Sequence, residues 1–303
     1  MDIARLRALR ELSARQTMAA VAEALFLTPS AVSQQIAQLE EEVGMPLTER
    51  QGRGVRLTPA GERLVAHAER ILIMLDEAKS DLAEIKREIA GVLRVAAFPT
   101  VAAALLPQAI QALQASYPHL DIVFKELEPA DGLAALGSWN VDVAFVDNLT
   151  NLLVQKYKNI DQVPLIEDVL YVLLPQGHRL AQRQSLAVSD LRGERWALDS
   201  AVSFYGEFIL NLCRRAGYEP RVNAECRGFE VVREMVASGC SISIIPGLRR
   251  VNDLAGVSAV KLRPEARRRI SVAFRHGERN HPAVKVFLDQ MVLTAKAVSE
   301  ATN

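Results

Sequence analysis

Hydrophobic residues between positions 1 and 44 recur every three or four residues, which is the period of an amphipathic α-helix. The apolar face of a first helix is formed by Ile3, Leu6, Leu9 and Leu12. A second helix, with the alanine-rich sequence MAAVAEAL, begins after Thr17 at residues 18–25. The apolar stripe of a third helix is formed by Val32, Ile36, Leu39 and Val43. We therefore expect three short helices that bury these faces against one another.

The third helix has clear end signals and an unusual polar face. Thr28 can cap free backbone amides, Pro29 suits the first helical position, and Gly44 can end the helix. The face opposite the apolar stripe carries Ser30, Ser33, Gln34, Ala37 and Gln38. These short side chains permit close approach to another backbone, and the amides can both donate and accept hydrogen bonds, as the reading of base edges requires. The N-terminal half of this helix is therefore a candidate DNA reader, with an ordinary core helix as the alternative.

The segments on either side of the third helix favour the DNA-reading interpretation. The second and third helices are separated by a tight turn, and the alanines of the second helix permit the close packing of a helix-turn-helix. Residues 49–61, ERQGRGVRLTPAG, predict a two-stranded wing with a glycine turn. The wing presents Arg50, Arg53 and Arg56, and arginine in such a position can bind phosphates or enter a narrow minor groove.

The order of these elements resembles the N-terminal domain of the LysR-type transcriptional regulators. The resemblance rests on the first two helices, the stretch TPSAVSQQIAQLEEEVGMPLTER (residues 28–50), the glycine wing and LTPAGERL (residues 57–64), and it continues to the C-terminus. It implies an all-α winged helix-turn-helix DNA-binding domain over residues 1–58. The candidate DNA-binding residues, taken from the start and polar face of the third helix and from the wing, are Thr28, Pro29, Ser30, Ser33, Gln34, Gln38, Arg50, Arg53 and Arg56. Gln34 and Ala37 stand where the family often has a basic residue, so we expect few phosphate contacts and a shallow salt dependence of binding.

A long helix with heptad spacing follows the wing. The apolar positions alternate by four and three residues and are Leu64, Ala68, Ile71, Leu75, Ala78, Leu82, Ile85 and Ile89. This spacing is typical of a coiled-coil seam, so we expect residues 59–90 to form a dimerisation helix, with an intradomain helix as the alternative. A dimer would carry two DNA readers for a roughly symmetric site. The resemblance implies that this helix is the family's linker helix and that dimers commonly pair into tetramers.

After Gly91 the pattern changes to an alternation of strands and helices. The first unit is predicted to have strands at residues 92–98, 121–127 and 141–146 and helices at 101–117 and 131–138. The second unit is predicted to have strands at residues 170–175, 196–199, 221–226 and 241–246 and helices at 204–216 and 230–237. A last strand at 269–275 and a helix from 282 to about 299 lack partners in the second unit and are expected to return to the first. This order predicts a mostly parallel sheet with helices on both faces.

These two units imply a two-lobed α/β effector domain over residues 91–303, of the periplasmic-binding-protein-like kind. Lobe I is predicted to comprise residues 91–161 and 267–303, and lobe II residues 162–266, joined by a hinge. Ligands of open α/β sheets bind where strands end and helices begin.

The resemblance places a small effector in the cleft between the lobes. The effector-binding residues expected by position are Thr100, Val101, Asp147, Ser203 and Phe204. Thr100 and Ser203 are predicted to cap helices, and a purely structural capping role is the alternative for each. Asp147 would disfavour a simple carboxylate ligand unless a cation offsets its charge, and a ligand carrying an amine is one possibility.

Composition and charge narrow the class of protein. With 303 residues, of which 50% are hydrophobic, the chain can bury the cores of two or three domains. Its 36 basic residues balance 36 acidic ones, so DNA binding would depend on the placement of charge rather than on its total. No apolar run is long enough to span a membrane, and the charged N-terminus is unlike a secretory signal, which indicates the cytoplasm. Cys213, Cys226 and Cys240 have no CxxC spacing and are interpreted as buried apolar residues, with a redox sensor as the alternative.

No catalytic motif is recognisable in the sequence. The patterns HExxH, GxSxG, GxGxxG and a Walker loop are absent. The histidines are scattered, at His67, His119, His178, His276 and His281. We therefore expect neither an enzyme nor a bound metal or cofactor. The expected function is sequence-specific DNA binding controlled by a small-molecule effector, with a two-lobed solute-binding module without a transcriptional role as the alternative.

The expected partners are double-stranded promoter DNA, the effector, and further copies of the chain in a homodimer or homotetramer, with RNA polymerase as a further candidate. The sequence leaves open the identity and charge of the effector, the operator and target genes, and the choice between activation and repression. It also leaves open whether the dimer or the tetramer is the resting state.

Overall fold

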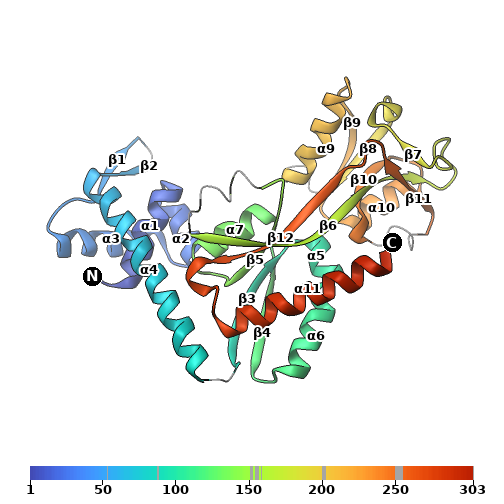
Figure 1. Ribbon diagram of the computed structural model, residues 1–303. Helices are drawn as coiled ribbons and strands as arrows, with labels where there is room; N and C mark the ends of the chain where they lie inside the picture. The colour runs from blue at the N-terminus through green and yellow to red at the C-terminus, as the bar shows by residue number, and fades with distance from the viewer. Residues whose placement is uncertain are drawn as a thin grey trace.

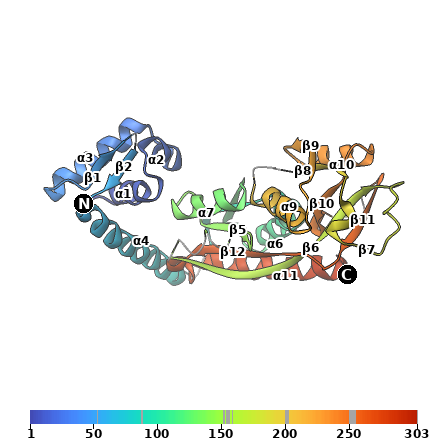
Figure 2. The ribbon, with the colours of Figure 1, turned by 90° about the horizontal axis from the view of Figure 1, so that it is seen from above.

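The computed structural model has a small N-terminal domain joined by one long helix to a larger α/β domain (Figure 1). It describes residues 1–52, 54–86, 89–150, 153, 157, 159–199, 203–249 and 255–302. Seen from above, the long helix runs obliquely from the N-terminal domain to one end of the sheet of the α/β domain (Figure 2).

The N-terminal domain contains the three helices and the wing that the sequence predicts. The helices are α1 (Ile3–Arg15), α2 (Met18–Leu25) and α3 (Pro29–Val43), and the antiparallel wing strands are β1 (Thr48–Gln51) and β2 (Gly54–Leu57). Thr17 and Thr28 cap α2 and α3 through their side chains, and Gly44 ends α3 with a positive φ of 73°. The predicted bounds of α2 and α3 are therefore confirmed, because local capping chemistry decides them.

The apolar faces of these helices form one core. Its buried members are Leu6, Ala8, Leu9, Leu12, Val21, Ala22, Val32, Ile36, Leu39, Leu47, Leu57, Val65 and Ala68. Two members of the predicted stripes lie at its edge, since Ile3 is 37% exposed and Val43 is only partly buried. The last two core residues belong to the long helix, which therefore closes the domain.

The long helix α4 (Pro59–Lys86) has two apolar faces. One face packs against its own chain through Val65, Ala68 and Leu72. The other carries Ile71, Met74, Leu82 and Ile85, all exposed, with Leu82 at 63% and Ile85 at 75%. The predicted seam is thus exposed from Ile71 to Ile85, with Leu75 partly buried.

The prediction for α4 is wrong at both ends of the seam. Ala68 is buried in the N-terminal core, and Leu64 packs against that core, because the first turns of α4 complete the domain. Ile89 lies beyond the helix and packs against the core of the α/β domain.

The α/β domain is built on a mixed sheet with the strand order β4-β3-β5-β12-β6-β11-β7, in which β10 also pairs with β6. Its strands are β3 (Gly91–Ala97), β4 (Leu120–Glu126), β5 (Val143–Asp147), β6 (Ile160–Pro175), β7 (Ser185–Leu186), β10 (Ser243–Pro246), β11 (Val257–Leu262) and β12 (Arg267–Arg275). Strands β8 (Arg195–Asp199) and β9 (Arg221–Cys226) form a separate parallel pair.

The helices of the domain cover both faces of this sheet. They are α5 (Pro99–Ala104), α6 (Leu106–Ser116), α7 (Pro129–Gly137), α9 (Phe204–Arg215), α10 (Phe229–Ala237) and α11 (Pro282–Thr302). Short 3-10 turns occur at Val188–Leu191, Gly247–Arg249 and His276–Glu278. Val143 and Phe145 of β5 point to the face covered by α6 and α11, whereas Ala144 and Val146 point to α7 on the opposite face, as the two-residue period of a strand requires.

Several predictions about this domain are confirmed and several are wrong. Strands β3, β4 and β5 are parallel, and β12 and α11 return to this first unit, as expected. The sheet is not mostly parallel, because β12 runs antiparallel to both β5 and β6 and because β10 and β11 run antiparallel to β6. The single helix predicted over residues 101–117 is divided into α5 and α6 at Leu105, since Pro107 suits the first turn of a new helix rather than a helix interior.

Different hydrophobic clusters support the two halves of the domain. The first half contains β3, β4, β5 and α5, α6, α7 and α11. The second half contains β7–β11 with α9 and α10. Strand β12 pairs with the first part of β6, from Ile160 to Val169, and these two strands run between the halves. The exact lobe boundaries given above stay a prediction.

Candidate functional site

The candidate DNA-reading residues of α3 lie together on an open face of the N-terminal domain. Ser30, Ser33 and Gln34 are exposed, and Gln38 is partly buried. Thr28 and Pro29 are exposed at the start of the helix, where the Thr28 hydroxyl accepts a hydrogen bond from the Ala31 amide at 3.2 Å. The side chains that the sequence selected are therefore accessible, and their contacts with DNA stay a prediction.

The wing places arginine next to α3, but one of these arginines has a partner. Arg50 is exposed at the end of β1. Arg56 lies opposite Glu49 across the wing, and its Nε donates to Glu49 Oε1 at 2.9 Å. An exposed ion pair of this kind is worth about 0–1 kcal/mol, so a phosphate can displace it at small cost. Arg53, also predicted to bind DNA, lies outside the described residues.

The N-terminal domain contacts the α/β domain of the same chain through the C-terminal end of α7, beside which it lies in both views (Figure 1, Figure 2). Arg10 of α1 donates to the Gly137 carbonyl at 2.6 Å, and the Asn140 side chain donates to the Ala24 carbonyl of α2. Trp139 lies between them, with the guanidinium carbons of Arg7 and Arg10 at 5.3 and 5.5 Å from its ring centroid. The sequence reasoning did not find this contact, because it joins residues more than a hundred positions apart.

A buried ionic cluster fixes α4 to the same region. Asp76 of α4 accepts hydrogen bonds at its Oδ2 from Trp139 Nε1 at 2.9 Å and from Arg275 Nε at 3.1 Å. Arg275 is only 2% exposed and also donates to the carbonyls of Leu136 and Val141. Its remaining partners are two further carboxylates, those of Asp142 and Glu278. Burial raises the pKa of Glu278 to about 7 even though Arg275 lies beside it.

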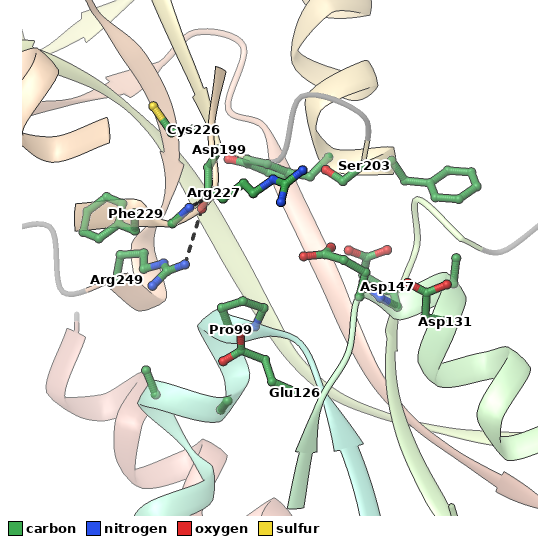
Figure 3. A pocket seen from close by; sticks show the side chains of 18 of the residues that line it. Pro99, Glu126, Asp131, Asp147, Asp199, Ser203, Cys226, Arg227, Phe229 and Arg249 are labelled. Atoms are coloured by element: carbon green, nitrogen blue, oxygen red, sulfur yellow. Dashed lines mark hydrogen bonds and ion pairs between the residues drawn. The ribbon is translucent and has the colours of Figure 1, made fainter. Parts of the chain in front are cut away.

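A large cavity opens between the two halves of the α/β domain, with a volume of about 1200 Å³ (Figure 3). Pro99, Glu126 and Asp147 line it from the first half, and Ser203 and Arg249 line it from the second. A smaller cavity of about 40 Å³ shares part of this wall. Both are bounded by strand ends and by the starts of α5 and α9, as open α/β sheets provide.

The structure places four of the five expected effector-binding residues on these walls. Asp147, Ser203 and Phe204 line the large cavity, and Thr100 lines the small one. Ser203 caps α9, its hydroxyl accepting from the Gly206 amide at 3.1 Å. The side chain of Val101 is fully buried in the core of the first half, so only its backbone remains a candidate for ligand contact. The prediction is wrong for Thr100 as a cap, because α5 begins at Pro99 and its N-cap residue is Phe98. The ligand contacts of the remaining residues stay a prediction.

Charged side chains dominate the cavity, and of these the sequence reasoning named only Asp147. Its carboxylates are those of Glu126, Glu128, Asp131, Asp147, Asp199, Glu225 and Glu230. Its guanidinium groups are those of Arg227, Arg249 and Arg268. The sequence reasoning also foresaw the need for a cation to offset Asp147, and Arg268 of β12, 3.9 Å from that carboxylate, is such a cation.

Burial raises the pKa of several of these carboxyl groups. For Asp147 and Asp199 the main cause is desolvation, opposed by Arg268 and Arg249 respectively. For Glu128 desolvation is again the largest cause, and the neighbouring charges of Asp199 and Asp147 raise the pKa further. The cavity therefore holds carboxylates in excess of the cations that would stabilise them.

Metal binding and thiol reactivity find little support in the described part of the chain. No group of three or more His, Cys, Asp or Glu side chains there is arranged to hold a metal ion. Cys213 and Cys226 are buried, as expected, and burial raises the pKa of both thiols, which disfavours the reactive thiolate. Cys240 is exposed, contrary to expectation. Among the described helices, none has the length and apolar character to cross a membrane.

Two family models match the chain and together cover most of its length. Residues 3–62 match the model described as bacterial regulatory helix-turn-helix protein, lysR family. Residues 86–295 match the model described as LysR substrate binding domain. The first match contains α1–α3 and the wing, and the second contains every strand and helix that lines the cavity.

Individual proteins agree with these matches. The chain is 28% identical to the transcriptional dual regulator GltC of Bacillus subtilis over 81% of both chains. It is 27% identical to the DNA-binding transcriptional dual regulator OxyR of Escherichia coli, over 91% of this chain and 90% of that protein.

Solved structures share the fold. A full-length OxyR C199D from Pseudomonas aeruginosa has a TM-score of 0.68 at 23% identity, covering 97% of this chain and 95% of that one. Full-length CbnR complexed with its target DNA has a TM-score of 0.54 at 22% identity, covering 97% of this chain and all of that one, at 100%.

Proposed function

This chain belongs to the LysR family of bacterial DNA-binding transcriptional regulators, and from that premise we propose that it reads promoter DNA through the N-terminal half of α3 under the control of a small molecule in the cavity. It is a regulator with an effector-binding domain and not an enzyme. A solute-binding module without a DNA-binding domain is not favoured, because residues 3–62 match the helix-turn-helix model. We place the regulator in the cytoplasm, where promoter DNA is accessible.

The observation that carries the DNA-reading assignment is the exposed polar face of α3. Its Ser33 and Gln34 side chains are exposed, whereas Val32, Ile36 and Leu39 on the other side anchor the helix in the core. A helix anchored in this way presents a rigid row of short donors and acceptors to the major groove. Arg50 and Arg56 of the wing would then contact the adjacent backbone.

The exposed stripe of α4 supports a dimer. Ile71, Met74, Leu82 and Ile85 would lose contact with water if two α4 helices packed together. The burial of four such side chains favours association, since each stabilises by about 1.5–3 kcal/mol when fully buried. Dimerisation through α4 would fix the separation of two α3 helices and hence the spacing of the half-sites they read.

Helix α7 offers a direct route from the cavity to the N-terminal domain of the same subunit. Its first turn supplies Pro129 and Asp131 to the cavity wall. Its last residue, Gly137, accepts the hydrogen bond from Arg10 of α1. We propose that a ligand that draws the two halves together displaces α7, and that this displacement changes the angle of the paired DNA readers and the bend of the bound DNA.

Binding to the DNA upstream of the protein's own gene tests the proposed function. The full-length protein should retard this fragment in a gel shift far more strongly than a scrambled fragment of equal length. Gln34→Ala on α3 should weaken specific binding by about 1–3 kcal/mol while leaving non-specific binding unchanged. Gln182→Ala, at an exposed position in the second half, is the matched control and should leave both unchanged. Equal retardation of both fragments by the wild type would contradict the proposal.

A further inference from the structure

Two of the guanidinium groups around the cavity, those of Arg249 and Arg268, are already paired with carboxylates, whereas Arg227 forms no ion pair within the described residues. Arg249 forms an ion pair with Asp199 at 3.5 Å, visible at the cavity wall (Figure 3). Arg268 donates to Asp168 at 3.0 Å, and Asp168 lies behind the wall, where it also accepts the Leu248 amide. Within the described residues, no ion pair involves Glu126, Glu128 or Asp131. The unpaired carboxylates of the wall therefore outnumber its unpaired cation, Arg227, and the open space faces an excess of negative charge.

Arg268 is a second feature of the wall that points to a ligand. It is 5% exposed, and its guanidinium carbon lies 4.8 Å from the Phe98 ring centroid and 5.5 Å from that of Tyr205. Its Nε is buried and has no hydrogen-bond partner among the described residues. A buried donor without an acceptor costs about 1–3 kcal/mol, and because Arg268 lines the cavity, a ligand oxygen that reaches this Nε when the two halves close would be favourable there.

These two features require different groups on one molecule. The carboxylates of Glu128, Asp131 and Asp147 favour an ammonium or guanidinium group, which would also relieve their mutual repulsion. Arg268 favours an oxygen acceptor, and a carboxylate gives the strongest hydrogen bond. A dicarboxylate would satisfy Arg268 but would bring further negative charge to a wall that already has an excess.

We propose that the effector of this regulator is a cationic amino acid, a small molecule with a carboxylate for Arg268 and a cationic side chain for the acidic wall. The proposal rests on the proposed function, since it names the chemistry of the ligand in the same cavity. The cavity of about 1200 Å³ exceeds such a molecule, and closure of the two halves would bring both sets of groups onto it.

Calorimetric titration of the full-length protein with three pairs of probes tests the proposal. L-Lysine and L-arginine carry both groups, putrescine and agmatine carry only cations, and L-glutamate and succinate carry no cationic side chain. The cationic amino acids should bind most tightly, with the cation-only pair at least about tenfold weaker and the acidic pair weaker still. Tighter binding of either other pair, or no binding by the cationic amino acids, would overturn the proposal.

Variants of the cavity wall separate a specific site from general charge attraction. Asp147→Asn keeps the shape of the side chain and should weaken L-lysine binding about 30-fold, whereas Asp121→Asn, on an exposed part of β4, should not change it. Arg268→Lys retains a cation for Asp168 but loses the Nε donor, so it should abolish the preference for L-lysine over putrescine. If Asp147→Asn fails to fold, Glu128→Gln replaces it. Equal effects of Asp147→Asn and Asp121→Asn would contradict the proposal.

The gel shift on upstream DNA distinguishes a failure of the proposed function from a failure of the proposed effector class. Specific DNA binding combined with a preference for an acidic probe would retain the proposed function and reject the effector class. Loss of specific DNA binding would reject the proposed function whatever the titrations give.

Discussion

Replacing Asp76 tests whether the buried cluster holds α4 to the effector domain. The Asp76 carboxylate receives hydrogen bonds from Trp139 Nε1 and Arg275 Nε, and its side chain is 3% exposed. Asp76→Ala removes one charged hydrogen bond, worth about 1.5–3 kcal/mol, and leaves the indole N–H buried without an acceptor, which costs about 1–3 kcal/mol. Arg275 keeps Asp142 and Glu278, so the full cost of an isolated buried charge is not added. We expect a loss of about 3–5 kcal/mol in the free energy of unfolding.

Urea unfolding followed by tryptophan fluorescence measures this loss. The sequence has two tryptophans, so Trp196→Phe leaves Trp139, beside Asp76, as the sole reporter of the contact. Asp76→Asn retains an acceptor oxygen without the charge and should lose about half as much as Asp76→Ala. Glu77→Ala, at the exposed neighbouring position, is the control and should change stability by less than about 0.5 kcal/mol. A loss below about 1 kcal/mol for Asp76→Ala, or a loss equal to that of the control, would refute the reasoning.

Three further predictions concern pH, dimerisation and salt. Because the pKa of Glu278 is raised to about 7 in the folded state from 4.5, the folded protein holds a proton that the unfolded chain releases, and its stability falls as pH rises through this window. In urea titrations the wild type should lose about 3 kcal/mol more of its free energy of unfolding between pH 4.5 and 7 than Glu278→Gln does. Equal losses for the two proteins would count against the raised pKa. Leu82→Glu should convert the dimer to a monomer in analytical ultracentrifugation. Lys79→Glu, at an exposed position outside the predicted seam, is the control and should leave the dimer intact. A dimeric Leu82→Glu protein would place the interface elsewhere. The logarithm of DNA affinity should fall with the logarithm of salt concentration at a slope well below ten for the dimer, since Gln34 supplies no charge; a slope near ten would contradict this.

Local patterns predicted the elements of the N-terminal domain well. The bounds of α3 follow from Thr28, Pro29 and Gly44, which act within one turn of their own positions. The exposed face of α3 follows from the same periodicity that buries Val32, Ile36 and Leu39. Such features need no information from distant parts of the chain.

Features decided by distant contacts could not be predicted in this way. Strand β6 begins at Ile160, ten residues before the predicted start, because pairing with the distant strand β12 extends it over these residues. Ala68 fits the heptad pattern, yet the N-terminal core covers it. Arg268 is one of three consecutive arginines, and only the fold turns this one into the cavity beside Asp147.

The most direct test of the central claim is a footprint of the full-length protein on its own upstream DNA. Two copies joined along α4 with an α3 helix each should protect two half-sites on one side of the duplex, separated by whole helical turns, and Gln34→Ala should weaken both equally. A single protected half-site, or protection unaffected by Gln34→Ala, would contradict the account.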